Sequence, residues 1–174
     1  MCVADALVGV AFGAITVGSG LPLWLPVLLS VLAFAGAAQF LFVGVVAAGG
    51  SPLGAAAAGI LVNVRLVPLG LAVGDVLGGS WLRRVVGAHL LVDETAAFTL
   101  AQEQRDRRHT AYWACGVALV ACWNLGVLGG AVLTDTDALG LDAAFPAVLL
   151  ALIGVLTALP QRSRPGRGPT APSP

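Results

Sequence analysis

Four polar side chains within two apolar stretches have the chemistry to bind a charged ligand. Asn63 and Arg65 come at the end of a long run, residues 6–64, that contains no charged residue. Asp93 and Glu94 form a second polar island further along the chain. The planar guanidinium of Arg65 can bind a carboxylate and stays protonated in an apolar setting. Because a carboxylate can bind an ammonium group or exchange a proton, the set suits a zwitterion such as an amino acid.

Gln39 and Gly36 complete the candidate binding set. The Gln39 amide can both donate and accept hydrogen bonds, and Gly36 lets backbone groups face a ligand. We expect these two residues and the four above to converge around a cavity beside a helix break at Gly36, because an isolated charge in hydrocarbon costs about 2.5–3.5 kcal/mol. A structural ion pair between Arg65 and Asp93 would explain the same charges without a ligand, and the sequence leaves both interpretations open.

The composition identifies an integral membrane protein. Hydrophobic residues make up 58% of the chain, charged residues only 10%, and the mean hydropathy is +0.93. A bilayer requires such long uncharged runs, and a water-soluble domain of this size could not bury them. The formal net charge is zero, which argues against a nucleic-acid partner. The apolar stretches are longer than the strands of a β-barrel and lack the alternation of apolar and polar residues that such strands show. We therefore predict an all-α fold within the lipid bilayer.

Turn residues divide the apolar sequence into about six predicted helical segments. These segments cover residues 6–18, 23–48, 53–77, 82–101, 111–133 and 143–159. Residues 1–159 are therefore predicted to form a single transmembrane domain. The Pro- and Arg-rich residues 160–174 are predicted to form a disordered cytoplasmic tail.

Glycines in these segments predict both close packing and breaks. Pairs of small residues recur at helical spacing, which allows helix backbones to approach closely in lipid. These sets are Gly9/Gly13, Gly54/Ala58, Gly70/Gly74/Gly78 and Gly126/Gly130. We expect Gly36 and Gly70 to mark breaks in their helices.

Loop charges predict the orientation in the membrane. Residues 102–110 and the tail each carry three Arg, whereas residues 134–142 carry three Asp and no base. The positive-inside rule places the Arg-bearing loop and tail in the cytoplasm. Arg83 and Arg84 contradict this topology if residues 82–101 cross the bilayer. They agree with it if that segment is re-entrant, with both ends inside.

Four sequence elements in order resemble the AzlC family, the large subunit of branched-chain amino acid permeases. The resemblance is clear over residues 8–102 and continues weakly to residue 142. The usual His and Tyr after the Asn-x-Arg element are replaced here by Leu66-Val67-Pro68. The matching elements are Ser30, Phe34–Phe40 (FAGAAQF), Asn63-Val64-Arg65 and Leu91–Glu94 (LVDE).

The resemblance implies a multi-pass protein of the inner (plasma) membrane that exports branched-chain or similar small apolar amino acids. It also implies a partner, a small hydrophobic AzlD-like membrane subunit. The sequence carries no hydrolase elbow, zinc motif, ATP-binding loop or metal-ligand spacing, so we expect no enzyme activity, no cofactor and gradient-driven transport. The chain also ends earlier than relatives tend to. The alternative is accordingly a non-transporting membrane scaffold or a truncated paralogue of such an exporter.

Overall fold

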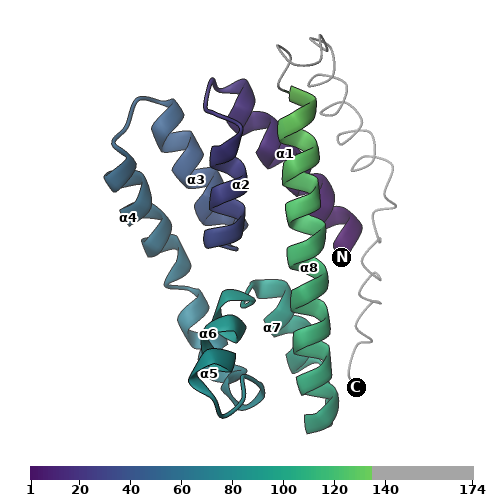
Figure 1. Cartoon of the computed structure of the whole chain (residues 1–174). Coiled ribbons are helices and arrows are strands. Elements are labelled where there is room, and N and C mark those ends of the chain that lie inside the picture. The colour runs from purple at the N-terminus through teal and green to yellow at the C-terminus, as the bar shows by residue number, and fades with distance from the viewer. Residues whose placement is uncertain (135–174) are drawn as a thin grey trace, which may run out of the picture.

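The described part of the chain, residues 1–134 of the computed structural model, is entirely helical (Figure 1). The all-α prediction is therefore confirmed for these residues. The expected sixth segment (143–159) and the predicted tail (160–174) lie outside the described residues. The elements in chain order are α1 (Cys2–Gly18), α2 (Trp24–Leu32), α3 (Gly36–Ala47), α4 (Pro52–Asn63), α5 (Leu66–Ala72), the 3₁₀ helix η1 (Gly74–Val76), α6 (Trp81–His89), α7 (Asp93–Leu100) and α8 (Arg105–Thr134).

Helix α8 is the longest element, and α1, α2 and α7 pack along it, whereas α4 packs on α3 (Figure 1). Its 30 residues span about 45 Å at the usual rise of an α-helix. Within residues 1–134 it is the only single helix long and apolar enough to cross a bilayer. Helices α4 and α5 meet the same test together, with a bend of 41° between them. The crossing of the membrane by any of these segments stays a prediction.

Helix α1 lies against the C-terminal half of α8 at a distance that only glycine permits. A Cβ atom added to Gly9 would lie 2.7 Å from the carbonyl oxygen of Trp123. Small residues at such a crossing let two helix backbones touch. The close packing predicted for the pairs Gly9/Gly13 and Gly126/Gly130 is therefore confirmed. The other three glycines would overlap the backbone of the facing helix in the same way: Gly13, Gly126 and Gly130.

On α4 the packed small residues differ from the predicted pair by one position. Ala55 and Gly59 are buried, whereas the predicted pair Gly54 and Ala58 is not. A Cβ atom on Gly59 would lie 3.5 Å from the Cβ of Ala38 in α3. Residues 54–59 are all Gly or Ala, so two small-residue stripes run along this helix and the sequence pattern cannot distinguish them.

Helices α2 and α3 form a helical hairpin, named here the first re-entrant pair, whose two outer ends lie at the end of the fold where α8 terminates. A Cβ atom on Gly18, just before this pair, would lie 3.6 Å from the side chain of Thr134. The chain reverses at residues 33–35, where Phe34 packs edge-on against Trp123 with 6.5 Å between ring centroids. The tip of the pair therefore reaches only part of the way along α8.

The α3 helix then returns toward the end at which α2 began. Val43 of α3 joins the same hydrophobic cluster as Val127 of α8, and the loop into α4 lies at that end of the fold (Figure 1). The predicted segment over residues 23–48 thus consists of two helices, α2 and α3. The expected break beside Gly36 is confirmed, because Gly36 is the first residue of α3.

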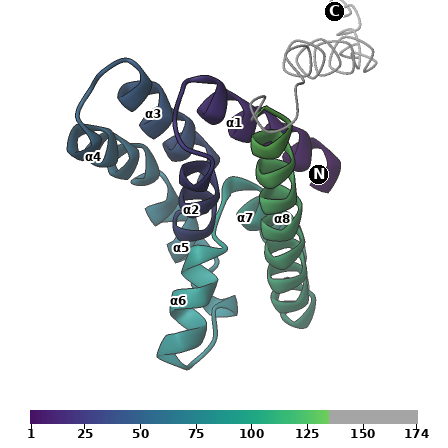
Figure 2. The same cartoon turned by 45° about the horizontal axis from the view of Figure 1, so that its top comes forward.

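Helices α6 and α7 form a second re-entrant pair, which enters from the opposite end, where α8 begins (Figure 2). The hydroxyl of Tyr112 in α8 donates a hydrogen bond to the carbonyl oxygen of Gly87 in α6 at 2.7 Å. At the turn of the pair, Leu90 packs on Gly116. Helix α7 then returns along α8, so that Phe98 faces the first turns of that helix.

The second pair resolves the conflict in loop charges. Arg83, near the start of α6, lies beside His109 and Trp113 in the first turns of α8. Both ends of the α6–α7 pair therefore lie at the end of the fold that carries Arg105 and Arg107. This geometry favours the re-entrant alternative for residues 82–101 over a full crossing.

Pro68 explains where the third segment bends. A proline clashes with the carbonyl group four residues earlier and donates no backbone hydrogen bond. Four residues before Pro68 is Val64, the C-cap residue that directly follows α4. Gly70 lies inside α5, so its predicted role as a break is wrong. The bend places Arg65 between the two helices.

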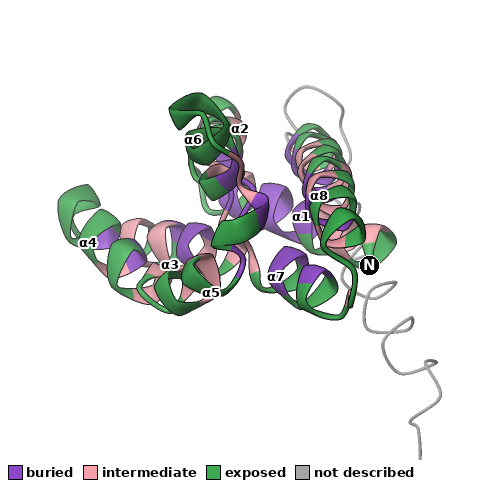
Figure 3. Ribbon diagram, turned by 90° about the horizontal axis from the view of Figure 1, so that it is seen from below, coloured by how far each residue is buried: buried purple, intermediate pink, exposed green. Residues whose placement is uncertain are grey.

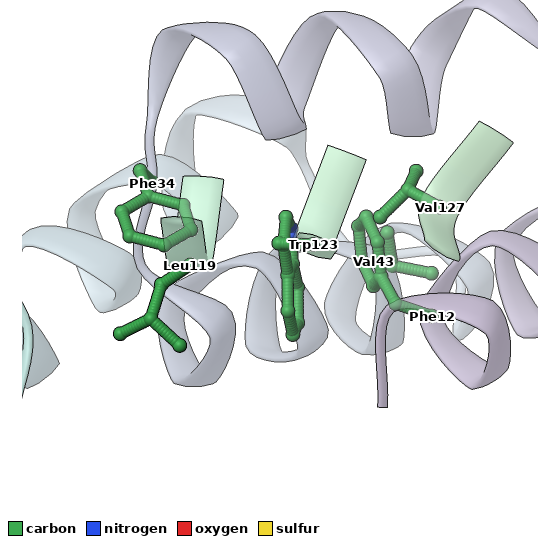
Figure 4. Packing of buried hydrophobic residues seen from close by; sticks show 6 residues of the cluster. All are labelled: Phe12, Phe34, Val43, Leu119, Trp123 and Val127. Carbon is green, nitrogen blue, oxygen red and sulfur yellow. The ribbon is translucent and has the colours of Figure 1, made fainter. Parts of the chain in front are cut away.

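Two hydrophobic clusters lie along α8. Figure 3 shows buried residues on α1, α7 and α8. Trp123 lies between the other members of the first cluster, which joins α8 to α1, α2 and α3 (Figure 4). The second cluster joins the N-terminal half of α8 to the re-entrant pair α6–α7 and the end of α5. The first contains Phe12, Phe34, Val43, Leu119, Trp123 and Val127, and the second Val73, Val76, Leu90, Leu91, Ala96 and Tyr112.

Candidate functional site

A cavity of about 430 Å³ lies where the tips of the two re-entrant pairs meet. Its walls come from the start of α1, the break between α2 and α3, the bend between α4 and α5, the start of α7 and the middle of α8. Five charged or amide side chains line it: Asp5, Asn63, Arg65, Asp93 and Glu94. The apolar part of the wall includes Val8, Phe34, Phe40, Leu119 and Trp123.

Arg65 and Asp93 form an ion pair in this wall. Nη2 of Arg65 lies 3.0 Å from Oδ2 of Asp93, and the two side chains are 54% and 48% exposed. The ion pair therefore lies at an open part of the cavity rather than in a sealed core. An ion pair this exposed contributes about 0–1 kcal/mol to stability, so it is a weak structural device.

The bend and the re-entrant tip bring the remaining polar residues to the same place. Asn63 is the last residue of α4, two positions before Arg65. Asp93 and Glu94 are the first two residues of α7, where the helix dipole favours negative charge. Thr95 fixes this turn, because its hydroxyl donates to the carbonyl oxygen of Leu90 at 3.0 Å and accepts from the Val92 N–H at 3.0 Å.

Gly36 lines the cavity at the other tip. It begins α3, whose N-terminus has no side-chain cap. A Cβ atom on Gly36 would lie 3.1 Å from Cη2 of Trp123, so the absence of a side chain lets the start of α3 approach the indole ring. The structure thus gathers five of the six predicted site residues around one cavity. Their role toward a ligand stays a prediction.

Gln39 is the predicted site residue that the structure places elsewhere. It is 1% exposed and is absent from the cavity wall. Its Nε2 donates to the carbonyl oxygens of Ala33 and Leu29, which belong to the broken end of α2. Gln39 therefore stabilises the reversal of the first re-entrant pair. Sequence reasoning could not separate this role from ligand binding, because a buried amide suits both.

Asp5 is a cavity residue that the sequence analysis did not select. It lies in the first turn of α1, and its buried Oδ2 has no hydrogen-bond partner within residues 1–134. Asp5 and Glu94 are the acidic groups of the wall outside the ion pair of Arg65 with Asp93, and acidic groups attract cations. The only sequence signal was an acidic residue beside the first apolar segment.

A second ion pair lies outside the cavity. Nη1 of Arg108 is 3.1 Å from Oδ2 of Asp75, and Nη2 of Arg108 also donates to the carbonyl oxygen of Ala72. This pair fixes the start of α8 to the end of α5. Within the described residues, no group of three His, Cys, Asp or Glu side chains is arranged to hold a metal ion.

The fold and the cavity define a class of protein. Broken helices whose ends line a polar cavity inside an apolar helical bundle are the architecture of membrane transporters. The family described as AzlC protein matches residues 1–136, well over half of the chain. The chain therefore belongs to the AzlC family, as its sequence elements predicted, and is a membrane permease-like protein of branched-chain amino acid transport. No curated protein and no solved structure matches it.

Proposed function

We propose that the protein is the large subunit of a transporter that exports branched-chain or similar small apolar amino acids. The observation that carries this proposal is the cavity, in which a guanidinium and three carboxylates share one wall with large apolar side chains. A zwitterion with an aliphatic side chain needs this combination. Charged side chains alone would also suit a simple ion, and apolar side chains alone would also suit a lipid chain.

The residues divide between the two charged groups of the substrate. Arg65 binds the substrate carboxylate through its fork, and Asn63 supplies a further amide donor. The ammonium group lies against Glu94 and Asp5, whose carboxylates are not engaged in the ion pair. Substrate competes with Asp93 for Arg65, and the half-exposed ion pair can separate at small cost.

The two re-entrant pairs supply access from both sides. Each pair reaches the cavity from a different end of α8, so a small movement of either tip opens the cavity toward that end. The sequence holds no ATP-binding loop, and export is therefore driven by an ion gradient or by the amino-acid gradient itself. A small AzlD-like membrane subunit completes the transporter.

The test is valine efflux from loaded cells. Cells that express this chain together with a small AzlD-like subunit are expected to lose intracellular valine faster than cells that express either protein alone. Expression of each protein in the membrane is verified by immunoblot. Equal valine retention in all strains would contradict export and favour the alternative, a non-transporting membrane scaffold.

A further inference from the structure

Trp123 is a tightly packed part of the apolar cavity wall. It is 4% exposed and is held between two aromatic rings, Phe12 at 6.0 Å and Phe34 at 6.5 Å between centroids (Figure 4). Its ring also lines the cavity together with Leu119, one turn earlier on α8. The indole is therefore part of both the core and the site.

The backbone and the ring of Trp123 are both fixed in position. The carbonyl oxygen of Trp123 faces Gly9 so closely that a Cβ atom there would lie 2.7 Å away, which prevents α8 from moving toward α1. On the cavity side, the indole edge lies directly against Gly36. A Cβ atom at Gly36 would lie 3.1 Å from Cη2 of Trp123, so the ring would have to shift. An aromatic ring packed this tightly acts as a rigid wall.

We propose that Trp123 determines substrate specificity by limiting the size of the side chain that the cavity accepts, with Gly36 setting the position of its ring. This inference rests on the proposed function. With the charged groups of the substrate held by Arg65 and the carboxylates, the side chain points to the apolar wall. A branched aliphatic chain fits beside the indole, whereas a larger aromatic chain must displace it.

Two substitutions change the wall in opposite directions. Trp123→Phe removes the second ring and enlarges the cavity, so the ratio of phenylalanine efflux to valine efflux is expected to rise about tenfold. Gly36→Ala adds a methyl group 3.1 Å from Cη2 of Trp123, on the cavity side of the ring, and so reduces the space beside the indole. The ratio of leucine efflux to valine efflux is therefore expected to fall about tenfold, since one methylene changes binding by this amount.

Trp113→Phe is the matched control. Trp113 lies on the same helix, is half-buried and donates its indole N–H to the carbonyl oxygen of Val76 at 3.3 Å, outside the cavity wall. Its substitution removes the same ring and is expected to leave both ratios unchanged. A change of equal size in this variant would attribute the effect to general loosening of α8 and overturn the proposal.

The remaining outcomes are distinct. Unchanged ratios in Trp123→Phe and Gly36→Ala, with valine efflux retained, overturn the specificity role and leave the proposed transport function intact. Absence of valine efflux in the unmodified protein with its partner overturns the proposed function itself. If Trp123→Phe does not accumulate in the membrane, Gly36→Ala decides alone, because it removes no core atom.

Discussion

At the scale of single residues, the exposure of the ion pair between Arg65 and Asp93 bears on whether Arg65 binds substrate or has a purely structural role. Its side chains are about half-exposed, so solvent or ligand can reach both partners. A charge placed for stability is normally more enclosed and bonded to several groups, as Arg108 is to Asp75 and Ala72. The exposure of Arg65 therefore favours a role in contacting substrate over a purely structural one.

We expect Arg65→Leu to lower valine efflux about 10- to 100-fold, because the substrate carboxylate loses a charged hydrogen-bond donor. The thermal midpoint of the purified protein should change little, since an exposed ion pair contributes at most about 1 kcal/mol. Arg108→Leu is the control: it should lower the thermal midpoint more and the efflux per folded molecule less. Recovery of efflux in the double variant Arg65→Leu, Asp93→Leu would show that the ion pair has only a structural role.

At the scale of elements, the contact between α1 and α8 sets the frame for the cavity. It places Asp5 in the wall and holds the backbone of Trp123. Both effects depend on glycines that bring two backbones into contact. The re-entrant pairs then pack against this frame, and Gln39 and Thr95 stabilise their reversals.

Gly130→Ala should destabilise the protein by about 1–3 kcal/mol, the usual cost of overpacking, because the new methyl group overlaps the backbone of Val10. The neighbouring substitution Gly129→Ala is the matched control. No described atom of another element lies within 4 Å of a Cβ there, so it should be neutral or stabilising by about 0.5–1 kcal/mol. Unfolding in detergent measures both, and equal effects would contradict the close crossing.

At the scale of the whole molecule, two re-entrant pairs enter from opposite ends and meet at the cavity (Figures 1 and 2). Each pair opens on Trp-Leu, at Trp24 and Trp81, and continues as a helix of nine residues before a three-residue break. The two pairs therefore share the pattern of their first helix and break, whereas the returning helices differ, with 12 residues in α3 and 8 in α7.

Single cysteines test this arrangement in a variant without the three native cysteines. Ser19→Cys and Ala48→Cys flank the first pair and should react with an impermeant maleimide applied outside the cell. Gly79→Cys and Gln104→Cys flank the second pair and should react only after permeabilisation, because the positive-inside rule predicts that the Arg-rich end is cytoplasmic. Reaction of the last two from opposite sides would show that α6 and α7 cross the membrane.

The sequence alone determined the properties that depend on local composition. Uncharged apolar runs dictate helices, Gly36 predicts the start of a helix after a break, and charges isolated in apolar sequence predict a pairing such as Arg65 with Asp93. The order of short elements identified the AzlC family.

Only the tertiary structure decided which residues share the cavity. Asp5 and Glu94 are far apart in the chain and meet because α1 and α7 pack on the same helix, a fact that no local pattern carries. Gln39 does not line the cavity, because its amide donates to backbone carbonyl groups at the break between α2 and α3. Whether residues 82–101 cross or return also depended on contacts with α8, since the same apolar composition permits both paths through a membrane.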